Sequence, residues 1–147
     1  KPSEARKRVF IKDNEEITVD YLKQFSREHL KRGKENQCLL TLTPRDFSFI
    51  AEEKLSHIFA VLAQYKLKLN LMQNSAISFS FCIDNHEAIL TDFIKELQKE
   101  YEVLYNRDVK LITIRHYTEN CIQEIIGRQP ILVEQRSRIT AQFVLHN

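Results

Sequence analysis

The stretch from residue 39 to 83 constrains the fold most, because the spacing of its apolar residues changes from a helical period to a strand period. Four apolar residues recur at i, i+3, i+4 and i+7, which places on one helix face Leu55, Ile58, Phe59 and Leu62. Further on, apolar and polar residues alternate, as in a strand covered on one face; the apolar ones are Leu67, Leu69 and Leu71, then Ile77, Phe79, Phe81 and Ile83. The polar residues 73–75 between these runs predict an antiparallel hairpin.

The flanking residues extend this pattern on both sides. Residues 39–42 predict a strand that Pro44 interrupts, and residues 46–50 predict a second, separate strand. Asp84, with Glu87 three residues later, predicts a capping box. The following helix is expected to bury Ile89, Leu90, Phe93, Ile94, Leu97 and Tyr101. Residues 102–105 and 109–114 then predict two strands with a turn at 106–108.

The predicted elements spell a split βαβ unit, an α+β fold with helices on one face of an antiparallel sheet. A second run of strand, short helix (119–126, ended by Gly127), strand (131–135) and strand (139–145) follows. The spare strand 39–42 is available to complete this second sheet. We therefore predict two ferredoxin-like units, the first (46–107) inserted in the second (38–43 plus 108–147). Residues 1–37, with a short strand at 9–11 and a weak helical pattern at 21–30, are interpreted as a linker.

Composition excludes several classes of function. The net charge of +2 creates no field that would attract nucleic acid or an anionic membrane. No apolar run approaches a membrane span, and a cytoplasmic protein is expected. Cys38, Cys82 and Cys121 lack metal-ligand spacing and are interpreted as buried thiols.

No catalytic or metal motif is present. The chain has two glycines, too few for most phosphate-binding loops. The histidines at 57, 86 and 116 are isolated, and we predict no catalytic residue and no metal. An RNA-recognition sheet needs exposed aromatic residues, whereas Ser78, Ser80 and Cys82 occupy the corresponding face.

One small-molecule site is suggested by the loop that enters the first helix. Backbone N–H groups at a helix N-terminus bind carboxylates. Asn70, Asn74 and the pair Glu52 and Glu53 offer oxygen acceptors for an ammonium group. Together they suit an α-amino acid, although ordinary turn chemistry explains the same residues.

The sequence LLTLTPRDFSFIAEEKLSHIFAVLAQYKLKLNLMQNSAISFSFCID resembles the paired ACT domains at the C-terminus of bacterial aspartate kinases. The resemblance covers about residues 37–147, with VEQRSRITAQFVL similar to the closing strands of the second ACT unit. It implies a regulatory domain of an enzyme that phosphorylates aspartate, with ATP and Mg²⁺ bound only in an upstream kinase lobe. This chain alone is then expected to be inactive and to need no cofactor.

The resemblance also implies a homodimer built by side-by-side ACT units, with lysine or threonine bound at the interface. Carried onto this sequence, the effector contacts would be Phe49, Ile50, Ala51, Glu52, Glu53, Lys54, Leu55, Leu69, Asn70, Asn74 and Ser75.

Two departures from the family pattern concern this site. Lysine-sensing members often carry Asp at the position of Asn70 and Glu at the position of Ala76. Replacement of these carboxylates by Glu52 or Glu53, a threonine effector, and loss of sensing remain alternatives. A structural dimerisation module with a vestigial pocket is the second hypothesis, and a free-standing RNA- or metal-binding protein is the third. The final helix of the second unit is also missing from the pattern.

Overall fold

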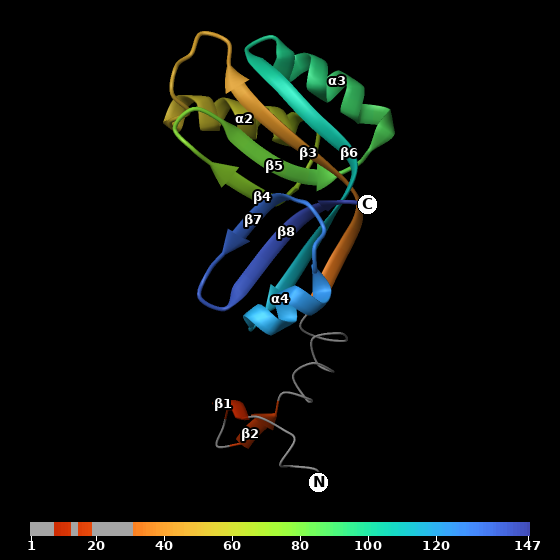
Figure 1. Ribbon diagram of the computed structural model, residues 1–147. Coiled ribbons are helices and arrows are strands. Elements are labelled where there is room, and N and C mark those ends of the chain that lie inside the picture. The colour runs from red at the N-terminus through yellow and green to blue at the C-terminus, as the bar shows by residue number, and fades with distance from the viewer. Residues whose placement is uncertain (1–7, 13–14, 19–30) are drawn as a thin grey trace. The chain divides into compact units, whose positions relative to one another are not determined.

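The computed structural model describes residues 8–12, 15–18 and 31–147, with side chains described from residue 32 onward. The described elements are, in chain order, β1 (Arg8–Lys12), β2 (Glu15–Thr18), β3 (Lys31–Pro44), α2 (Glu52–Gln64), β4 (Leu69–Asn74), β5 (Phe79–Asp84), α3 (Glu87–Gln98), β6 (Tyr101–Arg115), α4 (Glu119–Ile125), β7 (Ile131–Arg136) and β8 (Thr140–His146) (Figure 1). β1 and β2 pair with each other, and the remaining strands form one sheet in the order β4-β5-β3-β6-β8-β7.

The chain divides into two compact units. One holds residues 34–111 with 144–147, and the other holds residues 112–143 with the N-terminal hairpin. The short strand expected at residues 9–11 is confirmed as β1, whereas the helical pattern at 21–30 lies outside the described residues. Residues 31–37, expected to be linker, begin the long strand β3.

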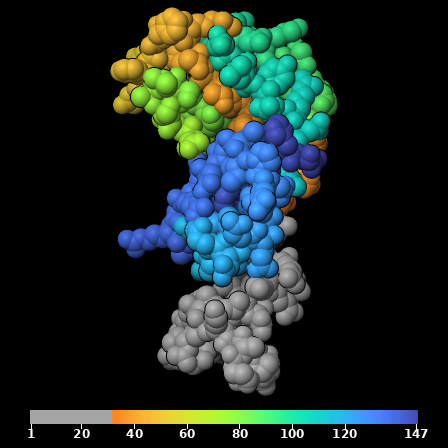
Figure 2. All heavy atoms as spheres, in the orientation of Figure 1, coloured from red at the N-terminus to blue at the C-terminus, as the bar shows by residue number. Residues whose placement is uncertain are grey.

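The 34–111 unit has the predicted split βαβ order, β3-α2-β4-β5-α3-β6. Its strands lie in the order β4-β5-β3-β6, with β5 antiparallel to both of its neighbours. Helices α2 and α3 cover the same face of the sheet (Figure 1). Figure 2 shows the atoms of this unit packed against one another. The α+β prediction is therefore confirmed.

The core of this unit lies between the sheet and its helices. It is rich in aromatic side chains, whose ring contacts link strand to helix: Phe81 lies edge-on to Phe93 with centroids 6.2 Å apart. The largest fully buried side chains here are Tyr101, Phe79, Phe81, Phe93, Leu40 and Leu42. Since each buried side chain of this size contributes about 1.5–3 kcal/mol, this cluster provides the main stabilisation of the unit.

The helical prediction for α2 is confirmed, with Ile58 and Leu62 buried and Leu55 packed against the core. Phe59 is 39% exposed, although its ring packs edge-on against Phe79. The helix begins at Glu52, directly after its N-cap Ala51.

Three local predictions are wrong. Residues 46–50 form no strand, because Asp46 starts a turn and Phe47 has a positive φ of 61° that an extended ladder does not accept. Asp84 ends β5 instead of capping α3, whose N-cap is His86. The expected turn at 106–108 is absorbed into the continuous strand β6, in which Asp108 takes a φ of 57°, a conformation that Asp tolerates better than most residues.

The hairpin is shifted from its predicted position. β4 continues through Asn74, and the turn runs from Ser75 to Ser78. Ile77, expected on the core face of a strand, therefore lies in the turn and is 63% exposed. A register shift between Leu69 and Leu71 places Leu71 opposite Cys82.

The strand pairing of β3 also differs from expectation. Residues from Gln37 to Leu42 pair with β5, although the sequence suggested that 39–42 belong to the second sheet. The division into 46–107 and 38–43 plus 108–147 remains a prediction. The observed pairing places this stretch of β3 beside the first of these two units.

Between residues 119 and 146, the predicted helix and two strands are found as α4, β7 and β8. Thr118 caps α4 by accepting a hydrogen bond from the Cys121 backbone N–H at 3.1 Å. Gly127 follows the helix with a φ of 62°, the left-handed conformation that glycine adopts at little cost. None of the helices in the described part of the chain is both long enough and apolar enough to cross a membrane.

Candidate functional site

The loop between β3 and α2 is held in one conformation by its own side chains. Asp46 accepts hydrogen bonds from the Ser48 backbone N–H at 3.0 Å and from the Ser48 hydroxyl at 2.7 Å. These two bonds lower the pKa of Asp46, so that its carboxylate is ionised near neutral pH. The Ile50 backbone N–H then donates to the Ala76 carbonyl at 2.7 Å, which ties the loop to the β4–β5 turn.

The first turn of α2 presents backbone N–H groups that no described side chain caps. Ala51 is the N-cap, and its methyl group has no hydrogen-bonding atom. Glu52 and Glu53 occupy the first turn and are exposed. A helix N-terminus of this kind is suited to an anion such as a carboxylate, although the two glutamates oppose a negative ligand.

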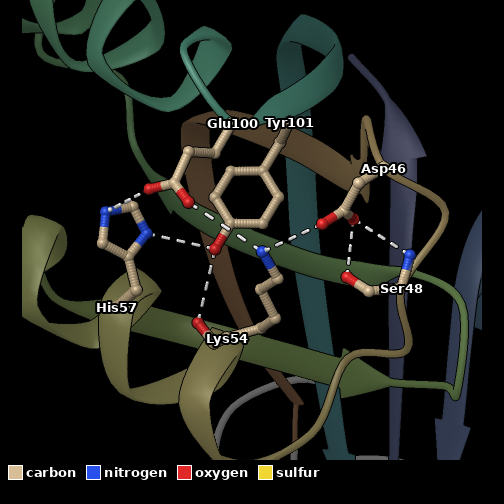
Figure 3. A network of polar contacts seen from close by, with 6 residues as sticks. All are labelled: Asp46, Ser48, Lys54, His57, Glu100 and Tyr101. Carbon is tan, nitrogen blue, oxygen red and sulfur yellow. Dashed lines mark hydrogen bonds and ion pairs between the residues drawn. The ribbon is translucent and has the colours of Figure 1, made fainter.

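Lys54 joins a network of polar contacts with residues of the loop and of the β6 start (Figure 3). Its ammonium lies 4.0 Å from Asp46 Oδ2 and 3.9 Å from Glu100 Oε1. The same ammonium lies 5.8 Å from the centre of the Tyr101 ring, within range of a cation–π contact. Lys54 therefore connects the loop to the beginning of β6.

His57 and Tyr101 complete this network (Figure 3). His57 Nε2 lies 3.0 Å from Glu100 Oε2, and His57 Nδ1 lies 3.1 Å from the Tyr101 hydroxyl. Burial raises the pKa of Tyr101 to about 12, with the Glu100 and Asp46 carboxylates adding to the effect. The phenol is therefore neutral at physiological pH, and the network ties the loop and α2 to the beginning of β6.

The serine hydroxyl predicted to contact a ligand closes the β4–β5 turn. Ser75 Oγ lies within 3.2 Å of the Ser78 carbonyl oxygen and accepts from the Ser78 backbone N–H at 3.1 Å. Asn74 is exposed at the end of β4. Through the Ile50–Ala76 hydrogen bond, this turn and the α2 loop form one continuous surface.

Asn70 lies at the other end of β4, in a second polar cluster. Its Nδ2 donates to Gln37 Oε1 at 2.7 Å and to Asp84 Oδ1 at 2.9 Å, and its Oδ1 accepts from Lys34 Nζ at 3.2 Å. Gln37 Nε2 also donates to Asp84 Oδ1, at 2.7 Å. These amide hydrogen bonds, that of Gln37 first, lower the pKa of Asp84.

The predicted site residues thus fall into two groups. The α2 loop and the β4–β5 turn come together and hold Phe49, Ile50, Ala51, Glu52, Glu53, Asn74 and Ser75. Lys54 and Leu55 face the polar network and the core, respectively, and Leu69 packs against the core. Asn70 is separated from the loop by the length of β4.

Sequence reasoning missed three members of the Asn70 cluster: Lys34, Gln37 and Asp84. Asp84 had a competing interpretation as a helix cap, and Lys34 and Gln37 fell in the predicted linker. Their signal is visible only once β3 is known to start at Lys31, because the alternation of β3 then places Gln37 opposite Asp84.

The three cysteines are buried, as the sequence predicted. Burial raises the pKa of Cys38 to about 11 and that of Cys82 to about 12, so both remain protonated thiols near neutral pH. Among the described residues, no group of histidine, cysteine and acidic side chains is arranged to hold a metal ion.

Comparisons with known proteins give a clear structural relationship and no sequence match. No protein-family model matches the chain, and no curated protein does so either. Aspartokinase III of E. coli, in complex with lysine and aspartate, superposes with a TM-score of 0.62 and 19% identity over 79% of this chain. This chain spans 29% of that protein.

Two further structures have the same fold. A protein of Porphyromonas gingivalis W83 described as a C-terminal regulatory domain of aspartate kinase gives a TM-score of 0.65 at 15% identity, covering 79% of this chain and 84% of that one. The aspartate kinase of Clostridium acetobutylicum gives 0.64 at 15% identity, covering 79% and 31%. The chain therefore has the tandem ferredoxin-like fold of the ACT regulatory domains of aspartate kinases.

Proposed function

We propose that this chain is an amino-acid-sensing regulatory module of an aspartate kinase, which dimerises and transmits binding of lysine or threonine as feedback inhibition. The fold supports this role, and the position of the polar residues along β4 carries the more specific part of the proposal. The catalytic reaction, in which ATP phosphorylates the side chain of aspartate, would belong to a kinase lobe with its own ATP and Mg²⁺. Such a module would act in the cytoplasm.

The two halves of the candidate site lie too far apart within one chain to hold a single amino acid. Asn70 and Asn74 are four residues apart on β4, which corresponds to about 13 Å at 3.3 Å per residue. The α2 loop is attached at the Asn74 end, through the Ile50–Ala76 hydrogen bond. An amino acid is shorter than this distance, so the proposal needs a second chain to bring the halves together.

A twofold pairing of β4 solves this problem. Among the described strands β4 is an edge strand, with β5 as its neighbour in the sheet. An edge strand presents backbone groups that pair with another chain. If two copies of β4 pair antiparallel about an axis near Met72, Asn70 of one copy lies opposite Asn74 of the other. Each of the two equivalent sites then combines the Asn70 cluster of one copy with the α2 loop of its partner.

The apolar residues near this edge favour such a contact. Ile77 in the turn, Phe49 in the α2 loop and Phe59 on α2 are 63%, 69% and 39% exposed. Exposed aromatic and aliphatic side chains beside an edge strand are typical of a surface that another subunit covers.

The chemistry of the two halves suits the two charged groups of an amino acid. The uncapped N–H groups of α2 suit the carboxylate, and Asn70 with Asp84 suits the ammonium group. Lysine-sensing members often carry a carboxylate at the position of Asn70. In this chain Asp84, which accepts a hydrogen bond from Asn70, provides a carboxylate instead. A charged acceptor contributes about 1.5–3 kcal/mol, against about 1 for a neutral one.

A structural dimerisation module without a ligand is the second candidate function. The hydrogen bonds of Ser75 within its turn, and the contact of Asn70 with Lys34, favour it, because both groups already have partners. The two functions share the dimer and differ in ligand binding.

A thermal-unfolding titration with lysine, threonine and both together separates these two functions. A ligand at 100 times its Kd should stabilise the dimer by about 2.7 kcal/mol, a clear rise in Tm. Light scattering on the same sample should give the mass of a dimer. If the protein is a dimer that no amino acid stabilises, the structural function remains and the sensing function is contradicted. If it is a monomer at all concentrations, both functions are contradicted.

A further inference from the structure

The Asn70 cluster has one fully enclosed side chain at its centre. Gln37 is 1% exposed and is the one buried polar or charged side chain among the described residues. Its Nε2 donates to Asp84 Oδ1 at 2.7 Å and to the Glu35 carbonyl at 3.3 Å. Its Oε1 accepts from Asn70 Nδ2 at 2.7 Å and faces the Cys82 thiol at 3.5 Å. Every polar atom of this amide therefore has a partner.

The ionised Asp84 determines how both amides are oriented. A carboxylate only accepts hydrogen bonds, so Gln37 and Asn70 must each turn their NH₂ group toward it. The carbonyl oxygen of Asn70 is consequently directed away from Asp84. This oxygen is an acceptor that needs a donor from outside the three residues.

Lys34 provides this donor. Its ammonium donates to Asn70 Oδ1 at 3.2 Å, and its positive charge helps to keep Asp84 ionised. The contact is exposed, in contrast to the enclosed Gln37 amide. Exposed contacts of this kind contribute little to stability, so Lys34 can leave the cluster without disturbing it.

We propose that Asn70, whose amide is oriented by Asp84 and Gln37, forms a primary-ammonium site that the chain's own Lys34 fills through its hydrogen bond to Asn70 Oδ1, and that an ammonium ligand binds by displacing Lys34. The displacement exchanges one monocation for another and leaves the charge of the cluster unchanged. Lys34 is thus an internal competitor that lowers the affinity of the site for ammonium ligands. This inference rests on the proposed function in one respect, namely that Asn70 faces the ligand.

The direct test replaces the Lys34 side chain with a free molecule of the same chemistry. The Lys34→Ala variant of the full chain is titrated with n-butylammonium, and the side-chain amide resonances of Asn70 are followed by NMR. We expect butylammonium to move these resonances back toward their wild-type positions. Wild-type protein should need about fivefold more butylammonium for a comparable change, the factor expected for one exposed contact. Lys34→Met provides a second variant with a longer apolar side chain.

Two controls make the test specific. Tetramethylammonium carries the same charge without an N–H donor and should leave the Asn70 resonances of the Lys34→Ala variant unchanged. Lys68→Ala removes an exposed lysine just before β4, and this variant should respond to butylammonium as the wild type does. Equal responses of wild type and Lys34→Ala, or equal effects of the two cations, would overturn the proposal.

The ammonium site and the proposed function can fail separately in these experiments. If lysine and threonine fail to stabilise the protein but butylammonium restores the Asn70 resonances, the proposed function fails and the ammonium site stands. If an amino acid stabilises wild type and Lys34→Ala with equal affinity, and butylammonium has no effect, the ammonium site fails and the proposed function stands.

Discussion

The Tyr101 hydroxyl lies 3.1 Å from Nδ1 of His57, whose other ring nitrogen lies 3.0 Å from the Glu100 carboxylate. The imidazole therefore connects α2 to Glu100, the residue before β6, and to Tyr101, the first residue of β6 (Figure 3). Because Glu100 only accepts, His57 must donate from Nε2. The same hydroxyl lies 3.5 Å from the Lys54 carbonyl, which gives the tyrosine proton an acceptor within α2.

Tyr101 should ionise only in strongly alkaline solution, because burial raises its pKa to about 12. The unfolded chain has a tyrosine pKa near 10. The folded state therefore retains this proton to a higher pH. The contribution of Tyr101 to the free energy of unfolding should be fully present below about pH 10 and should be lost as the pH rises to about 12. Urea unfolding across this range measures the fall. In Tyr101→Phe, the absorbance step at the highest pH should disappear and stability should drop by about 1 kcal/mol; an unchanged titration curve would contradict the assignment.

Asp84 should contribute to stability on the acid side. Its pKa in the folded state is lowered by the amides of Gln37 and Asn70. Its contribution is therefore present above the unfolded value of about 3.9 and is lost as the pH falls through the lower folded value. We expect Asp84→Asn to cost about 1 kcal/mol at pH 7 and to flatten the loss of stability below pH 4. Asp92→Asn, on the exposed face of α3, is the matched control; equal effects of the two substitutions would argue against the cluster.

Ile77 tests the proposed dimer. It is 63% exposed beside the edge strand β4, so that a charge at this position should oppose a second subunit. We expect Ile77→Lys to convert dimer to monomer in light scattering, with the far-UV spectrum unchanged. Leu104 on β6 is comparably exposed, at 65%, and Leu104→Lys should leave the dimer intact. If both substitutions dissociate the dimer, or neither does, the interface does not lie at β4.

Phe47 should be a site of local strain. Its φ of 61° lies in the left-handed region, which is unfavourable for Phe. Its side chain is 88% exposed, so that packing of the ring offsets little of this backbone strain. Asn tolerates this conformation better, and Phe47→Asn should raise stability by about 0.5–1 kcal/mol. Phe47→Ala removes the same ring but keeps a Cβ that disfavours this φ, and it should change stability by less than about 0.5 kcal/mol. Urea unfolding of both variants compares them directly, and a loss of stability in Phe47→Asn would show that the ring has a partner.

Helices α2 and α3 were predictable because their apolar spacing repeats over several turns. Ile58 and Leu62 in α2, and Leu90 and Phe93 in α3, are buried as the pattern indicated. The boundaries were less predictable, because short-range signals compete. Asp84 has the residue type of a helix cap, yet two amides from β3 and β4 engage it instead.

The candidate site shows the same limit. The α2 loop and the β4–β5 turn, both assigned to the site from the sequence, lie side by side, since a helix–strand–turn sequence folds back on itself within a few residues. Sequence reasoning also grouped Asn70 with them, because four residues appear close in a sequence. In an extended strand those four residues span about 13 Å, which is why Asn70 belongs to a different cluster.

The order of the helices and of the strands β4, β5, β7 and β8 was thus determined by the sequence itself, through apolar periods that each element needs to bury one face. Tertiary structure alone decided that β3 pairs with β5 and that Gln37, enclosed by this pairing, orients Asn70 toward Lys34. The physical reason is that periodicity is a local property of the chain. Hydrogen bonds between side chains more than thirty residues apart exist only after the strands have taken their register.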